Sequence, residues 1–129
     1  MAGKYFPYIC NMKVLFLCYD KCSTCKKALK WLSEHNIEVN IRSITEDHPT
    51  YEELSVWLEQ SGLEIRRFFN TSGMKYRELG LKDRVSSESK EELLRLLSSD
   101  GMLVKRPLIV WEKGILLGFR EEEYQKALL

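Results

Sequence analysis

The feature that most constrains this chain is a pair of cysteines, Cys22 and Cys25, placed directly after a short apolar run. That run ends at Cys18 and is followed by polar turn formers, which predicts a buried strand over Lys13–Cys18. From Thr24 to His35, apolar residues recur at helical spacing. Cys22 therefore lies where a helix starts, and the unpaired backbone N–H groups and the helix dipole there favour thiolate over thiol.

Cys25 lies one helical turn after Cys22, within reach of a mixed disulfide formed on the first sulfur. The spacing predicts a dithiol redox site in which Cys22 is the nucleophile and Cys25 is the resolving cysteine. Cys25 also shares an apolar stripe with Ala28 and Leu29, so a small buried side chain without a redox role is the alternative. Cys18 ends the apolar strand, and we expect it to pack in the core.

Composition bounds the class of protein. The chain has 129 residues, enough for one domain, and its charge is nearly balanced at +1, which gives no reason to expect direct nucleic acid binding. No apolar run approaches the roughly 18 residues of a membrane helix, so we expect no membrane contact. All four cysteines fall between positions 10 and 25, which predicts one local site in a cytoplasmic protein rather than a disulfide framework.

The domain boundary is expected just before the first strand. Met12 and Lys13 directly precede that strand, so residues 1–11 are expected to be an N-terminal extension outside the fold, and Cys10 incidental. Residues 12–129 are expected to form a single domain.

The remaining elements predict an α/β fold. Alternating apolar and polar residues over 39–44 predict a second strand, parallel to the first in a βαβ unit. Residues from about 50 to 100 have a helical periodicity. This segment opens with Thr50 and Glu53, whose spacing is that of a capping box. Two apolar runs, 108–111 and 115–118, predict a hairpin with a three-residue loop, Glu112 to Gly114, followed by a helix over about 121–128.

The order is βαβ, then helices, then ββα. A C-x-x-C after the first strand and a proline opening the third are typical of a thioredoxin-like fold, here with a four-stranded mixed sheet and an inserted helical segment. Pro107 is that proline, and we expect the Arg106–Pro107 bond to be cis and to face the cysteines.

Several segments in the same order resemble a known family. The chain is similar to the arsenate reductase and Spx family of thioredoxin-like proteins, and the likeness spans nearly all of residues 12–129. The matching segments are Cys22-Ser23-Thr24-Cys25-Lys26-Lys27-Ala28, Phe68 to Gly73 with Tyr76, Leu79-Gly80-Leu81, Asp100 to Leu108, and Gly118-Phe119.

The resemblance implies a nucleophilic cysteine, matched by Cys22, surrounded by three arginines that bind an oxyanion. Arg106 matches one of these arginines. The other two positions fall on Asn70 and near Phe119, with Arg120 displaced by one residue. A second cysteine where glutathione-linked arsenate reductases have serine makes the chain more similar to the arsenate reductase-like branch that shares C-x-x-C with Spx.

Arg106 is expected to hold an anion and to stabilise the Cys22 thiolate, and a solvated charge beside a turn is the alternative. Ser23, Thr24, Asn70 and Pro107 are expected to line the same cleft as substrate-binding residues. For Asn70 a turn-forming role fits the sequence equally well.

No metal or bound cofactor is expected. The spacing of Cys18, Cys22 and Cys25 also occurs in iron–sulfur enzymes, but Cys18 belongs to a strand, and no second cysteine pair or histidine pair completes a zinc site.

The sequence therefore predicts a thiol-disulfide oxidoreductase that a thiol donor such as thioredoxin or glutathione regenerates. One alternative is a Spx-like redox-sensing regulator that binds RNA polymerase. The other is a true arsenate reductase with an altered oxyanion site.

Overall fold

Side chains that alternate between the two faces of one sheet organise the fold, which the computed structural model describes for residues 14–129. The sheet has the order β2-β1-β3-β4, in which β1 pairs parallel with β2 and antiparallel with β3, and β3 pairs antiparallel with β4. This is the four-stranded mixed sheet that the sequence predicts. The strands and the two helices of the βαβ and ββα units are β1 (Val14–Cys18), α2 (Ser23–Glu34), β2 (Val39–Ser43), β3 (Leu108–Trp111), β4 (Gly114–Leu117) and α7 (Glu121–Leu128).

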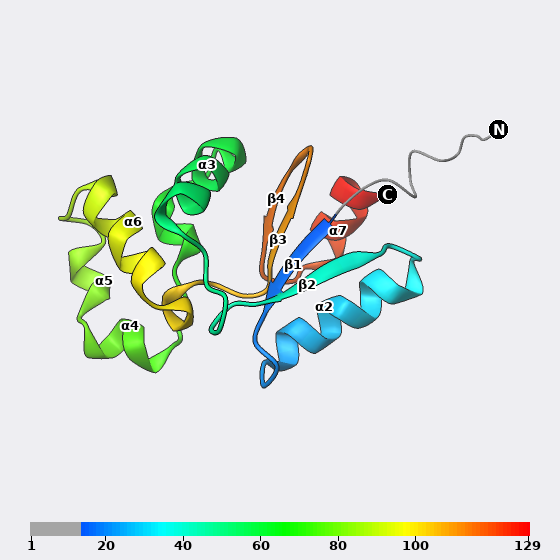
Figure 1. Ribbon diagram of the computed structural model, residues 1–129, viewed down its shortest axis with the longest axis horizontal. Helices are drawn as coiled ribbons and strands as arrows, with labels where there is room; N and C mark the ends of the chain where they lie inside the picture. Colours follow the sequence, from blue (N-terminus) through cyan, green and yellow to red (C-terminus); the bar gives the residue numbers. More distant parts are fainter. Residues whose placement is uncertain (1–13) are drawn as a thin grey trace.

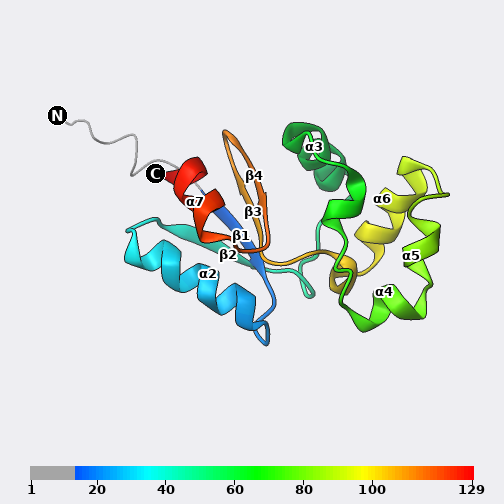
Figure 2. The same ribbon diagram turned by 180° about the vertical axis from the view of Figure 1, so that it is seen from behind.

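The predicted helical segment separates the two units in the sequence. In Figures 1 and 2 its helices gather on one side of the sheet, whereas α2 and α7 lie on the other side. Its elements are α3 (Tyr51–Ser61), the 3-10 helix η1 (Ile65–Phe68), α4 (Met74–Glu78), α5 (Leu81–Arg84), α6 (Lys90–Ser99) and the 3-10 helix η2 (Gly101–Leu103). The order βαβ, helices, ββα confirms the thioredoxin-like fold.

Each sheet face has its own apolar cluster, because successive strand residues point to opposite sides. Phe16 and Ile109 are fully buried against α2 and α7, in a cluster that includes Cys25 and Tyr124. Leu17 belongs to the cluster on the other face, together with buried residues of α3 and α6. Cys25 thus lies in the core beneath the sheet face that carries α2.

Two hydrogen bonds join the helical segment to the approach of β3. Asn70 N–H donates to the Leu103 carbonyl, and Lys105 N–H donates to the Phe68 carbonyl, both at 2.8 Å. Phe69 and Val104 form an isolated antiparallel bridge between the same stretches. Residues 68–70 and 103–105 therefore lie side by side, which holds Asn70 close to the residues that precede Pro107.

Local signals were confirmed except at one turn and one short helix. The capping box of α3 is present, since Glu53 N–H donates to Thr50 Oγ1 at 3.1 Å and Thr50 N–H donates to Glu53 Oε1 at 3.0 Å. The predicted three-residue hairpin loop is wrong, because Gly114 pairs with Trp111 as the first residue of β4, so the loop has two residues. The short helix α5 was not predicted.

Residues 1–11, predicted to be an extension, and Cys10 lie outside the described residues.

Candidate active site

Cys22 is the N-cap residue of α2. Its backbone is extended, with φ −97° and ψ 117°, and its own sulfur accepts a hydrogen bond from the Cys25 N–H at 3.4 Å. The thiol thus occupies the position that a serine or aspartate side chain usually fills at the start of a helix. A thiolate at this position receives the backbone donors that the first turn of the helix leaves unpaired.

The environment of Cys22 favours its ionised form. Partial burial raises the pKa of Cys22, but the backbone N–H and the side chain of Cys25, together with the Arg106 guanidinium, lower it more. The net result is a pKa below the ordinary thiol value. The thiolate is the reactive form of cysteine, so a lowered pKa in a partly exposed position makes Cys22 the more reactive.

Cys25 has the opposite character. Its side chain is 3% exposed, and burial raises its pKa to about 12. A backbone hydrogen bond with Tyr19 opposes this rise, whereas the neighbouring Cys22 adds to it. Cys18, half-buried against the same core cluster, has a pKa raised by burial and by the charges of Asp20 and Cys22. Cys22 is therefore the thiol best suited to act as a nucleophile among these three.

A pocket of about 380 Å³ opens at the Cys22 thiol, and we call it the thiol pocket. Residues from four separate parts of the chain meet there: the start of α2, the stretch after η1, the segment before β3 and the segment after β4. Its lining is Cys22, Thr24, Asn70, Ser72, Gly73, Lys105, Arg106, Leu117, Gly118, Phe119 and Arg120.

Arg106 lies half-buried in this lining. Its guanidinium carbon stands 4.8 Å from the centre of the Tyr19 ring, a cation–π contact, and Nη1 donates to the Met102 sulfur at 3.8 Å. These contacts hold the guanidinium at the pocket without an acidic partner among the described residues. The positive charge is therefore available to the Cys22 thiolate or to an anion in the pocket.

The predicted site residues divide into two groups. Cys22, Thr24, Asn70 and Arg106 line the thiol pocket, and Cys25 lies beneath it. The remaining two, Ser23 and Pro107, are not part of the lining: Ser23 is exposed at the start of α2, and Pro107 is buried.

The proline nevertheless has a defined position. The Arg106–Pro107 bond is cis, as predicted. The Pro107 carbonyl accepts a hydrogen bond from Gly118 N–H at 2.8 Å, which joins the start of β3 to the end of β4.

Two cations of the pocket were missing from the predicted site. Lys105 directly precedes Arg106, and Arg120 follows the position at which the resemblance places an arginine. That position is Phe119, whose half-buried ring packs edge-on against Tyr124 with centroids 4.8 Å apart, so its side chain lies against the core cluster. Arg120 is exposed at the pocket instead. The sequence offered one signal for Arg120, which is its position directly after Phe119, where the resemblance places an arginine.

Nothing in the described part of the chain resembles a metal centre, since residues 14–129 contain no group of three or more His, Cys, Asp or Glu side chains close enough to hold an ion. Within the same residues, no helix has the length and apolar character needed to cross a membrane.

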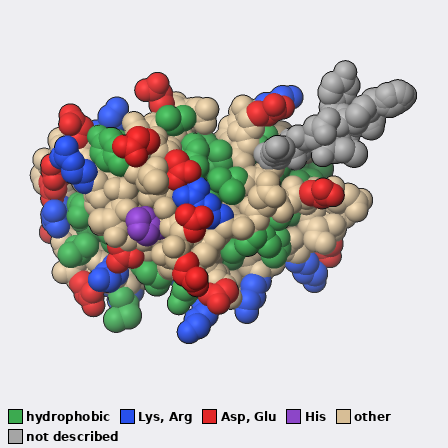
Figure 3. Space-filling view, in the orientation of Figure 1, with side chains coloured by type: hydrophobic (Ala, Val, Ile, Leu, Met, Phe, Trp, Pro, Cys, Tyr) green, Lys and Arg blue, Asp and Glu red, His purple; other side chains and the backbone are tan. Residues whose placement is uncertain are grey.

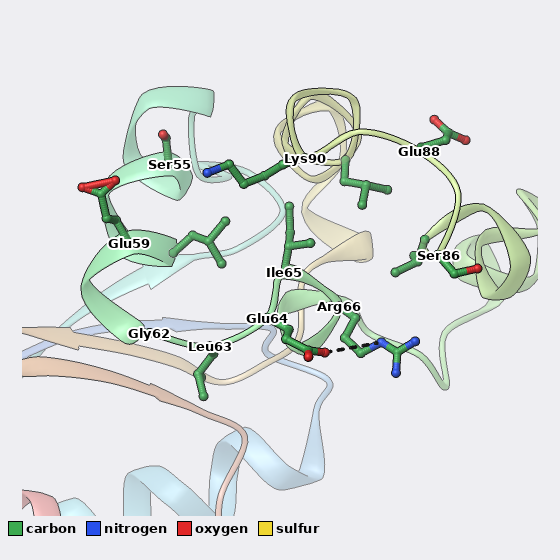
Figure 4. A pocket seen from close by; sticks show the side chains of 13 residues that line it. Ser55, Glu59, Gly62, Leu63, Glu64, Ile65, Arg66, Ser86, Glu88 and Lys90 are labelled. Atoms are coloured by element: carbon green, nitrogen blue, oxygen red, sulfur yellow. Dashed lines mark ion pairs between the residues drawn. The ribbon is translucent and has the colours of Figure 1, made fainter.

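A larger pocket, of about 760 Å³, lies within the helical segment (Figure 4). Its charges have both signs, with Glu64 and Arg66 paired at 4.0 Å, and it contains no cysteine. It shares no lining residue with the thiol pocket. The candidate chemistry therefore belongs to the smaller pocket, which holds the nucleophile.

Comparison with known proteins places this site in a family. Residues 17–127 match the ArsC family. The chain is 50% identical over 115 residues to the uncharacterized protein YusI of Bacillus subtilis (strain 168), covering 89% of this chain and 98% of that protein. It is 28% identical over 107 residues to the global transcriptional regulator Spx of Staphylococcus haemolyticus (strain JCSC1435), covering 83% of this chain and 80% of Spx.

Solved structures agree. An ArsC family related protein from Bacteroides fragilis matches with a TM-score of 0.88 and 52% identity, covering 92% of this chain and 98% of that one. The arsenate reductase from Vibrio cholerae matches with a TM-score of 0.79 and 28% identity, covering 89% and 97%. The resemblance inferred from the cysteine pair and the Lys-Arg-Pro segment is confirmed, and the chain belongs to the ArsC family.

Proposed function

We propose that this protein is a thiol-disulfide oxidoreductase in which Cys22 attacks a disulfide and Cys25 resolves the product. The observation that carries the proposal is the opposite tuning of two neighbouring thiols. The pKa of Cys22 is lowered at the helix N-cap, whereas burial raises that of Cys25 to about 12. Cys22 is thereby easier to ionise for attack, while Cys25 keeps its proton.

The reaction has two exchange steps. The Cys22 thiolate attacks one sulfur of a substrate disulfide, a Cys22–substrate disulfide forms, and the second substrate sulfur leaves as a thiolate. Cys25 then loses its proton and attacks Cys22 Sγ, which forms the Cys22–Cys25 disulfide and releases the remaining substrate thiolate. The two electrons gained by the substrate come from the two cysteines.

The pKa of Cys25 changes during this sequence. Burial is the largest cause of its raised value, but the hydrogen bond and the negative charge of Cys22 also contribute. Both contributions disappear once the Cys22 sulfur is bound in a mixed disulfide. Cys25 therefore becomes easier to deprotonate at the step that requires its thiolate.

A thiol donor must restore the dithiol after each turnover. A dithiol of the thioredoxin type, or two molecules of a monothiol such as glutathione, supplies the two electrons and leaves oxidised. These donors are abundant in the cytoplasm, which is the compartment that we propose for the protein.

The test is a mixed-disulfide trap. The Cys25→Ser variant is treated with bis(2-hydroxyethyl) disulfide, and intact mass spectrometry with peptide mapping locates the adduct. Among Cys18, Cys22 and Cys25 we expect a stable adduct only on Cys22, whereas in the chain with both cysteines Cys22 and Cys25 end as a disulfide without an adduct on either. Cys22→Ser serves as the matched control. An adduct that forms equally well in Cys22→Ser would overturn the proposal.

Reduction of arsenate is the second candidate function, because Lys105, Arg106 and Arg120 all line the thiol pocket. We expect this activity to be weak or absent, since Asn70 and Phe119 stand where the resemblance expects arginines. Each missing charged hydrogen bond costs about 1.5–3 kcal/mol, roughly a ten- to over a hundredfold loss in affinity. Turnover of arsenate in a thioredoxin-coupled assay at the rate of a dedicated arsenate reductase would contradict this expectation.

A regulatory function is favoured by the 28% identity with the transcriptional regulator Spx. On this alternative the cysteine pair acts as a switch, and the reduced and oxidised chains bind RNA polymerase with different affinity. A pull-down of RNA polymerase with each redox form separates a switch from a turnover enzyme. Retention that depends on the redox form, combined with no disulfide reduction, supports the regulator.

A further inference from the structure

Lys105 lines two neighbouring pockets at once. One is the thiol pocket, and the other has about 400 Å³ and lies against η1 and α5. Because both linings include this lysine, the two pockets are adjacent. Together they extend from the helical segment to Cys22. The lining of the second pocket is Arg66, Arg67, Phe69, Thr71, Tyr76, Lys82, Val85 and Lys105.

The charges on this surface have one sign. We call Arg67, Lys82, Lys105, Arg106 and Arg120 the cationic strip; all five line one or both pockets. None of them forms an ion pair with another described residue, and no described acidic residue lines either pocket.

The rest of the molecule differs. The chain as a whole has a net charge of +1, and Figure 3 shows acidic and basic side chains interspersed over one face. The large pocket of Figure 4 also mixes both signs. Unpaired cations that line two pockets without an acidic residue in either lining favour a local positive potential that the net charge does not reveal.

We propose that the cationic strip docks an acidic polypeptide segment of a partner protein and brings a disulfide beside that segment to Cys22. This inference rests on the proposed function, because the strip ends at the nucleophilic thiol. Attack and release then follow the exchange already described, with the partner's disulfide as the electron acceptor. The charge of the strip thus indicates the chemical class of the substrate, which is a protein disulfide flanked by Asp and Glu.

The exposure of the cations favours a polypeptide over a small ligand. Arg67, Lys82 and Arg120 are exposed, and Lys105 and Arg106 are half-buried. Small-molecule sites instead bury most of the ligand among a few fixed polar groups. Exposed cations spread over two shallow pockets act at longer range, by steering an oppositely charged protein into place.

Nucleic acid fits this surface less well. Single-stranded nucleic acids bind where bases stack on exposed aromatic rings between cations. In the second pocket Phe69 is 1% exposed, and the half-buried Tyr76 packs against it with ring centroids 6.1 Å apart. The second pocket therefore lacks a row of exposed rings between its cations on which successive bases could stack.

The kinetic test uses two synthetic peptides of equal length, each carrying one cysteine as a mixed disulfide with 2-nitro-5-thiobenzoate. Four Asp or Glu residues flank the cysteine in one peptide, and Asn or Gln replaces them in the other. Attack of Cys22 in the Cys25→Ser protein releases the coloured thiolate. We expect the acidic peptide to react at least about tenfold faster at 10 mM salt, and the difference to shrink as salt is raised to about 0.5 M.

Variants at the far end of the strip separate docking from chemistry. Arg67→Glu with Lys82→Glu changes exposed residues that line only the second pocket, and we expect it to remove most of the tenfold preference while the neutral peptide reacts within about twofold of the parent. Lys30→Glu with Lys126→Glu makes the same change in net charge outside both pockets and should keep the preference. An equal loss in the control variant, or no preference for the acidic peptide, overturns the proposal.

Anisotropy of fluorescein-labelled probes without a disulfide tests docking independently of the thiol. A cysteine-free acidic peptide should bind, and Arg67→Glu with Lys82→Glu should weaken it at least about tenfold. Tighter binding of an oligonucleotide of equal charge to the same strip overturns the choice of a polypeptide. The same choice is overturned if Arg67→Glu with Lys82→Glu slows the reaction of Cys22 with oxidised glutathione as much as it slows the reaction with the acidic peptide. If the acidic probe binds but Cys22 fails to react with either peptide, the proposed function fails and the docking surface stands.

Discussion

A difference in reactivity between Cys22 and Cys25 is the most direct consequence of the structure. The perturbation is alkylation of the native protein with iodoacetamide at pH 7, followed by peptide mass spectrometry of each cysteine over time. We expect Cys22 to be labelled about 50-fold faster than Cys25 or more. The reason is the thiolate fraction, because only the thiolate reacts.

The magnitude follows from the two pKa values. The pKa of Cys22 lies below the ordinary 9.0, so more than about 1% is thiolate at pH 7. A pKa of about 12 leaves Cys25 with about one thiolate in 10⁵ molecules. The thiolate fractions differ by about a thousandfold or more. The thiolate of the more acidic thiol is intrinsically less nucleophilic, which reduces this advantage about twentyfold and leaves a ratio of about 50. The burial of Cys25 slows its labelling further.

Two controls decide whether this reasoning holds. Replacement of Cys22 by serine removes the neighbouring charge and hydrogen bond that raise the pKa of Cys25, so Cys25 should be labelled faster than in the parent. In unfolding concentrations of guanidinium the labelling rates of all cysteines should converge. Labelling of Cys25 or Cys18 as fast as that of Cys22 in the native protein would refute the assignment of nucleophile and resolving thiol.

Three further outcomes test the charge beside Cys22 and the stability of the fold. Arg106→Met should shift the pH profile of Cys22 alkylation to higher pH, because a nearby positive charge favours the thiolate, with little change in stability; an unchanged profile would return Arg106 to a solvated charge. Glu53→Gln should cost about 1–2 kcal/mol of unfolding free energy at pH 7, after discounting for exposure, since a paired arginine lowers the Glu53 pKa to about 2. That stability is present above pH 4.5 and is lost as the pH falls toward about 2, so denaturation at several pH values should show the two proteins converging in acid. Gly101→Ala should cost about 3 kcal/mol or more, because an added Cβ would lie 1.7 Å from a backbone oxygen, whereas Gly114→Ala, with contacts at 3.5 Å, should change the unfolding free energy by less than about 1 kcal/mol.

The sequence predicted those features that depend on residues close together in the chain. The C-x-x-C spacing placed Cys22 at a helix start and Cys25 one turn inside, and both positions are observed. Hydrophobic periodicity gave the order of elements, and the proline position gave the cis bond at Pro107. Local chemistry decides the cysteine positions and the periodic elements, so they need no knowledge of tertiary contacts, whereas the cis bond followed from the place of Pro107 in the thioredoxin-like pattern.

The pocket itself was only partly predictable, because it joins four separate segments. Lys105 and Arg120 meet Cys22 through the pairing of residues 68–70 with 103–105 and through the turn after β4. Periodicity carries no information about which exposed cations face the same cleft. The role of the Cys22 sulfur as the N-cap of α2 was missed for another reason. Sulfur is a weak acceptor and is not among the usual capping groups.

The distribution of positive charge bears on the choice between an oxyanion and a disulfide as substrate. A small oxyanion is held best when several charged donors converge on one point, as preorganised donors do in a closed site. Here Asn70 is neutral and the apolar Phe119 ring packs against the core cluster, while the cations extend away from Cys22 over two pockets. Charge arranged along a surface favours an extended anion over a compact one. The same residues that weaken the case for arsenate thus strengthen the proposal of an acidic protein whose disulfide is delivered to Cys22.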